Sequence, residues 1–152
     1  MPRFSGAEID QGIEEFTSAQ AEGRLGVESL RRAMQALRRH MYLEEELLFP
    51  SMGSTFAIPI GVMLREHGEI WRTLDLLESQ LREGGPRDSV LDVCRVLLSQ
   101  LEVHNSREEP IFYTQADSLL GASASERLSS FLASGQIPEG WVCQGVRRSQ
   151  DR

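Results

Sequence analysis

Apolar residues recur every three or four positions along four long stretches of the chain, which are separated by glycine and proline. This period predicts amphipathic helices, here over residues 5–22, 27–49, 60–82 and 88–113. Pro50 ends the second stretch, and Gly84-Gly85-Pro86 separates the last two. No stretch reads convincingly as a strand, so an all-α fold is predicted.

Short connections favour antiparallel packing of neighbouring helices, which predicts an up-down-up-down four-helix bundle over residues 1–121. Residues 122–152 are expected to form a short helix, at 125–132, and a tail packed on the same domain, with a frayed end at 147–152. The length of 152 residues fits one domain.

Polar residues occupy the apolar stripes of three helices. The second helix carries His40 and Glu44, the third carries His67, and the fourth carries His104 and Glu108. Residues four apart project from one face of a helix, so each histidine–glutamate pair is predicted to point into the bundle.

The depth of these residues can be counted from the turns. His67 lies about 18 residues before the turn near Gly85, and His104 about 19 residues after it, so an equal rise per residue brings them to one level. Glu44 and His67 are likewise about 11 and 12 residues from the loop near Thr55. One layer of the bundle is therefore expected to hold histidine and glutamate from three helices.

Buried carboxylates are costly unless a positive charge compensates them. Two carboxylates in one layer also repel each other, and no lysine or arginine shares their stripes. A pair of metal cations would compensate both. Imidazole and carboxylate together suit iron, manganese or zinc.

Composition argues against some classes of binding partner and indicates a cellular location. The net charge of -7 argues against binding to nucleic acid or to anionic membranes. The chain has no apolar run long enough to span a bilayer, and its N-terminus does not resemble a signal peptide. Two cysteines do not make a disulfide framework, so a cytoplasmic location is expected. The expected partner is a small-molecule ligand, and the protein is expected to be a monomer or a weak homodimer.

Other side chains near the motifs have structural interpretations. Glu45 is expected around the ligands or in solvent, Arg38 and Arg39 in a solvated face, and Cys94 and Cys143 as unreactive thiols. Arg107 is a candidate partner for a carboxylate outside the ligand set.

Two HxxxE motifs resemble those of the hemerythrin-like (HHE cation-binding) family. The run HMYLEEELLFP at 40–50 matches the first motif of that family, including its leucine–phenylalanine–proline end. The pair at 66–67 and the run HNSREEPI at 104–111 match its other motifs. The resemblance covers residues 5–120.

This resemblance implies two iron ions joined by an oxo or hydroxo bridge, with manganese or zinc as alternatives. It implies that Glu44 and Glu108 bridge the irons, that His40 binds one iron, and that His67 and His104 bind the other.

The family normally supplies another histidine from its first helix, but residues 5–22 contain none. Asp10 lies three residues before Ile13 on the inward side and is the first candidate to replace it. The chain also has three histidines where oxygen-carrying relatives use five as ligands, so reversible dioxygen storage is not implied. The open alternatives to Asp10 are Glu8, Gln11 and Glu14.

The sequence is compatible with three functions. The first is a di-iron sensor, scavenger or weak peroxidase-like enzyme that handles dioxygen, peroxide or nitric oxide, since such chemistry requires an open coordination position. The second is iron handling, as in relatives associated with repair of iron–sulfur clusters. The third is a regulatory bundle in which metal only stabilises the fold.

Overall fold

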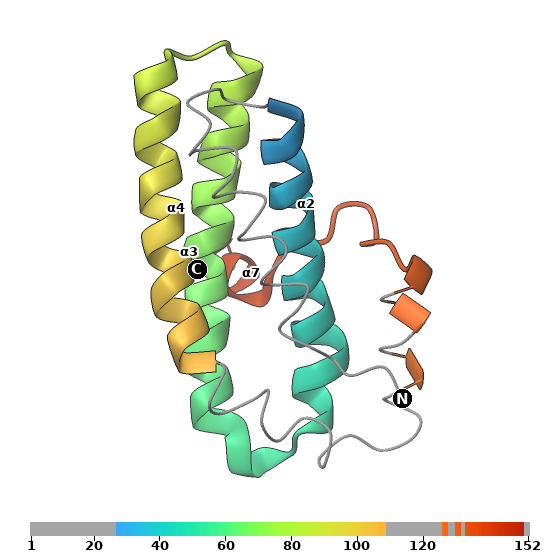
Figure 1. Cartoon of the computed structure of the whole chain (residues 1–152). Helices are drawn as coiled ribbons and strands as arrows, with labels where there is room; N and C mark the ends of the chain where they lie inside the picture. Colours follow the sequence, from blue (N-terminus) through green and yellow to red (C-terminus); the bar gives the residue numbers. More distant parts are fainter. Residues whose placement is uncertain (1–26, 109–125, 128–129, 132, 151–152) are drawn as a thin grey trace.

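Three long helices run side by side in the computed structural model, which describes residues 27–108, 126–127, 130–131 and 133–150 (Figure 1). They are α2 (Val27–Leu43), α3 (Ala57–Arg82) and α4 (Arg87–Glu108), and a short helix, α7 (Gln144–Gln150), follows near the end of the chain. No strand occurs among the described residues. The predicted all-α class is confirmed.

The helix predicted over residues 27–49 changes its pitch near the end. After α2 the chain forms a π-helical turn, η1 (Glu44–Leu48), and then a 3-10 turn, η2 (Phe49–Ser51). Pro50 lacks the backbone N–H that a longer helix would need. A second 3-10 turn, η3 (Ser54–Phe56), leads into α3, which begins three residues earlier than the predicted Ile60.

A tight turn joins α3 to α4. Gly84 has a positive φ of 67°, a conformation in which a side chain would be strained, and Pro86 directly precedes α4. The turn makes α3 and α4 antiparallel neighbours (Figure 1), as the short connection predicted.

The core between the long helices is built from the predicted apolar stripes. Leu30 and Leu37 of α2 meet Ile70 and Leu74 of α3 in one buried cluster with residues of α4. The same cluster contains Cys143 and Val146, so the C-terminal region packs against the long helices. The other members from α4 are Val90, Cys94, Leu97 and Leu101.

Two expectations for the outer parts of the chain were wrong. Residues 147–150 belong to α7 instead of a frayed end. Arg38 and Arg39 are not simply solvated: Arg38 pairs with Asp75 and stacks on the ring of Trp71, and Arg39 donates to the carbonyl oxygens of residues 131 and 135.

The helix expected at residues 5–22 and the end of the helix expected at 88–113 lie outside the described residues, so the four-helix arrangement stays a prediction. None of the helices in the described part of the chain is long and apolar enough to cross a membrane.

Candidate metal centre

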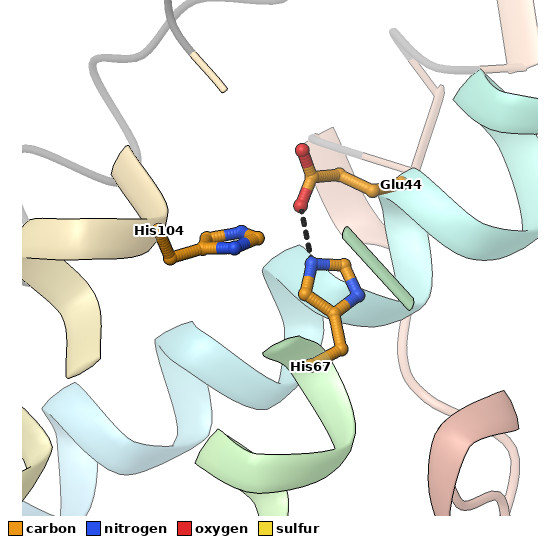
Figure 2. Close-up of side chains that lie close together, drawn as sticks. All are labelled: Glu44, His67 and His104. Atoms are coloured by element: carbon orange, nitrogen blue, oxygen red, sulfur yellow. Dashed lines mark hydrogen bonds and ion pairs between the residues drawn. The ribbon is translucent and has the colours of Figure 1, made fainter. Parts of the chain in front are cut away.

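Three elements bring Glu44, His67 and His104 together inside the protein (Figure 2). Glu44 comes from η1, His67 from α3 and His104 from α4. Each offers one donor atom, and these atoms lie within 4.8 Å of one another. The exposed fractions of the three residues are 0%, 0% and 4%. Bonds of about 2.0–2.2 Å from one ion to nitrogen or oxygen would need only small inward movements of these atoms.

His40 lies beside this group, one turn before Glu44. Its Nε2 atom is 3.4 Å from Oε1 of Glu44, and the residue is buried. The structure therefore brings together four of the predicted ligands. Glu108 is the last residue of α4, but its side chain lies outside the described part of the structure, as does the whole of Asp10.

Two consecutive glutamates in the π-helical turn η1 are buried here. Consecutive residues of an α-helix point about 100° apart, so Glu45 was expected outside the ligand set or in solvent. In the structure Glu45 lies outside the ligand group, behind His67, and it is buried there. Oε2 of Glu45 lies 2.7 Å from Nδ1 of His67.

His104 has an equivalent acidic partner, which the sequence did not assign to any role. Oε1 of Glu66 lies 3.0 Å from Nδ1 of His104, and Oε2 of the same carboxylate accepts a hydrogen bond of 2.7 Å from Arg107. The expected pairing of Arg107 with a carboxylate is confirmed. The sequence feature that could have indicated this role is the position of Glu66 directly before His67. In the structure the Glu66 side chain points towards α4.

These carboxylates decide which ring nitrogens can bind a cation. A neutral histidine that donates Nδ1–H to a carboxylate keeps the lone pair of Nε2 as an acceptor. For His67, that Nε2 atom lies 3.1 Å from Oε1 of Glu44, so two acceptors face each other unless a proton or a metal ion lies between them. Metal-binding histidines are commonly oriented by such carboxylate partners.

The electrostatics of the group follow from the same contacts. Burial alone would lower the pKa of His67, but hydrogen bonds and charges from Glu44 and Glu45 outweigh it and raise that pKa to about 9. Burial alone would raise the pKa of Glu44, but the charges and hydrogen bonds of His40 and His67 hold it well below its usual range. Without metal, a proton on His67 therefore balances the Glu44 carboxylate.

The pKa of His104 shifts in the opposite direction. Burial lowers its pKa, and the hydrogen bond with Glu66 offsets this effect only in part. The pKa of Glu66 is lowered as well, because hydrogen bonding with His104 and the charges of His104 and Arg107 outweigh burial. A neutral imidazole therefore donates to an ionised carboxylate, which is the form that leaves Nε2 able to bind a metal.

A small cavity adjoins these donors. Its volume of about 10 Å³ is close to what one water molecule needs. Apolar side chains of α2, α3 and α4 form much of its wall. The donor set of imidazole and carboxylate, with each oriented histidine backed by an acid, fits iron, manganese or zinc. The cavity is lined by Leu37, His40, Met41, Glu44, His67, Ile70, Leu101, His104 and Asn105.

Comparison with known proteins identifies the family. The model of the hemerythrin HHE cation binding domain matches residues 7–116. The chain belongs to this family, as its two HxxxE motifs predicted. All the side chains of the group described above fall within the matched region.

The curated relatives cover a shorter part of the chain. The iron-sulfur cluster repair proteins YtfE of Yersinia pestis and Yersinia pseudotuberculosis are each 34% identical to it over 68 residues. This match covers 42% of the chain and 31% of each relative, so the chain spans about a third of the length of those proteins. No solved structure matches the chain significantly.

Proposed function

We propose that this protein binds a non-haem di-iron centre and uses it to bind or sense dioxygen, peroxide or nitric oxide. The observation that carries the proposal is the buried group of Glu44, His67 and His104, in which a carboxylate oxygen lies within hydrogen-bond distance of Nδ1 of each histidine. A buried group with this chemistry is typical of a metal centre, and the family is one of cation-binding domains.

The position of Glu44 supports its proposed role as a bridging ligand. Its Oε1 atom lies 3.4 Å from Nε2 of His40 and 3.1 Å from Nε2 of His67, the two histidines that family analogy assigns to different irons. A carboxylate between them can bind both ions. In the same proposal His104 would bind the same iron as His67, and Glu108 would be the second bridging ligand.

The surroundings of the group support a small ligand. Iron supplies redox chemistry and an open coordination position when it is bound. The chain supplies apolar walls, from Leu37, Ile70 and Leu101 among others, which exclude bulk water from the group. The cavity of about 10 Å³ beside the donors is close to what one water molecule needs, which favours a ligand of very few atoms over an organic substrate.

Iron handling is the second candidate function, and the match to iron-sulfur cluster repair proteins favours it. The match covers less than half of the chain, so it supports this role only for the region shared with those relatives. A protein that donates iron must release it readily. A sensor must retain iron while its small ligand comes and goes.

Anaerobic loading with Fe(II) followed by visible spectroscopy tests the proposal. We expect wild-type protein to take up iron and to change its spectrum when nitric oxide or peroxide is added. His104→Ala should lose iron and the spectral response, whereas Glu102→Gln, an exposed change on the same helix, should keep both. Iron that resists a chelator favours the sensor, and iron that passes quickly to a chelator favours iron handling. An iron-loaded protein with no response to either ligand would contradict the sensing role.

A further inference from the structure

The C-terminal region contacts Glu45, the carboxylate behind His67, although it lies beyond the part of the chain that the family model matches. The family match ends at residue 116, and the segment at issue is 141–147. Cys143 of this segment is fully buried in the main core with Val146. Figure 1 shows α7, in red, near the middle of the long helices, and its contacts are mainly with α3.

Two glycines allow the segment to approach α3 closely. A Cβ atom on Gly145 would lie 2.7 Å from the carbonyl oxygen of Leu64 and 3.0 Å from Cα of Gly68. Both neighbours are backbone atoms of α3, which cannot move aside easily. Gly68 directly follows His67, so the segment meets α3 at the residue next to a proposed ligand.

Trp141 contacts three elements and so fixes the start of the segment. Its indole N–H donates a hydrogen bond of 2.9 Å to Oε1 of Glu46 in η1. Its ring makes edge contacts with Trp71 of α3 and Tyr42 of α2, at centroid distances of 5.5 Å and 5.1 Å. Arg147, at the other end of the segment, lies 3.6 Å from the same Glu46 carboxylate.

A single carboxylate joins the segment to the ligand group. The backbone N–H of Gln144 donates a hydrogen bond of 2.8 Å to Oε1 of Glu45. The other oxygen of Glu45 lies 2.7 Å from Nδ1 of His67. Because each oxygen has its own donor, the carboxylate is held from both sides and cannot rotate without losing one of the two bonds.

We propose that the segment 141–147 is a positioning element of the metal centre, in which the backbone of Gln144 holds Glu45 and Glu45 holds the ring of His67. This inference rests on the proposed function, since it assumes that His67 binds metal. Partners behind a metal-binding histidine typically change metal affinity 10–100-fold. Loss of the Gln144 bond alone, with Glu45 still present, should cost about tenfold.

Gln144→Pro removes this bond with little other change. Gln144 is the first residue of α7, where proline fits and no helical hydrogen bond is lost. Gln144→Ala keeps the backbone N–H and is the matched control. We expect Gln144→Pro to bind Co(II) and anaerobic Fe(II) about tenfold more weakly than Gln144→Ala, as measured by competition with a chelator.

Gly145→Ala tests the same link by displacing the segment from α3. Its control is Gly61→Ala, because a Cβ atom on Gly61 of α3 meets nothing within 4 Å. Weaker metal binding by Gly145→Ala, with Gly61→Ala unchanged, is the expected result. A lower melting temperature of Gly145→Ala and Gln144→Pro with unchanged metal affinity would show a purely structural role and overturn the proposal.

Amide hydrogen exchange on the unaltered protein gives a test that needs no variant. If the segment favours the metal-bound form, then metal must stabilise the segment by the same free energy. Exchange at Gln144 should therefore slow on metal loading, and an unchanged rate would also overturn the proposal. Failure of wild-type protein to bind either metal would instead contradict the proposed function, so the two failures are distinguishable.

Discussion

Oε1 of Glu66 lies 3.0 Å from Nδ1 of His104, across the interface between α3 and α4. The same relationship recurs between Glu45 and Nδ1 of His67, at 2.7 Å. Two histidines on different helices are thus each oriented by an acid from a neighbouring element. Histidines buried only for packing would not need a carboxylate partner at Nδ1, so the arrangement favours metal binding.

Glu66→Gln should weaken metal binding about 10–100-fold while the fold is kept. The side-chain amide has one acceptor oxygen, but Arg107 and His104 both donate to this position. One donor must lose its partner or His104 must change its tautomer. Chelator competition with Co(II) measures the effect.

Glu69→Gln is the matched control for that experiment, because Glu69 lies on the same helix and is exposed. Its affinity should equal that of wild-type protein. Equal affinities of all three proteins would show that Glu66 does not orient a ligand.

The stability of the metal-free protein should be greatest near pH 6.5. The pKa of His67 is raised from 6.5 to about 9, so its stabilisation is complete below pH 6.5 and is lost as pH rises through about 9. The pKa of His104 is lowered, so its contribution is lost as pH falls below 6.5. The lowered pKa of Glu44 adds a further loss below about pH 4.5.

Denaturant unfolding with a chelator present checks this profile. Between pH 6.5 and 9, His67 should contribute a loss of up to about 3 kcal/mol. His67→Gln removes the titrating group and should show a correspondingly smaller loss over this range. An identical pH dependence in the two proteins would contradict the proposed ion pair between His67 and Glu44.

Metal uptake at neutral pH should release protons. A proton that sits on His67 in the metal-free protein must leave before Nε2 can bind a cation. Calorimetric titration with Zn(II) in buffers of different ionisation enthalpy measures the number released. Zero protons at pH 7 would mean that the cation does not displace the proton of His67.

Both thiols should react slowly in the folded protein. Burial raises the pKa of Cys94 to about 11, and burial with the charge of Glu45 does the same for Cys143. A chromogenic disulfide reagent at pH 8 should label neither thiol quickly, and both should react at once in denaturant. Rapid labelling of native wild-type protein would contradict the packing of Cys143 against the core.

The periodicity of apolar residues and the number of residues between each candidate ligand and the nearest turn predicted much of the fold and of the candidate site. The apolar stripes gave the long helices that the structure describes, and the distances from the turns placed Glu44, His67 and His104 at one depth, where the structure also places them. The HxxxE motifs identified the family. Local spacing carries such information because the rise of a helix per residue is constant.

Features that depend on distant contacts were not predictable in this way. Glu45 is bound by residues far away in the sequence, the ring of His67 and the backbone of Gln144, which local spacing does not reveal. Arg39 is held by the carbonyl oxygens of residues 131 and 135, more than 90 positions away. The sequence also gave no sign that Gln144 would reach Glu45, because the donor is a backbone amide that every residue except proline possesses.

The most direct test of the central claim is the number of Fe(II) ions bound per chain under anaerobic conditions, in wild-type protein and in Glu44→Gln. Glu44 faces both His40 and His67, so its carboxylate should be required at both metal positions. We predict about two ions per wild-type chain and loss of both in Glu44→Gln. Wild-type protein that binds no iron, or Glu44→Gln that binds as much iron as wild type, would contradict the account.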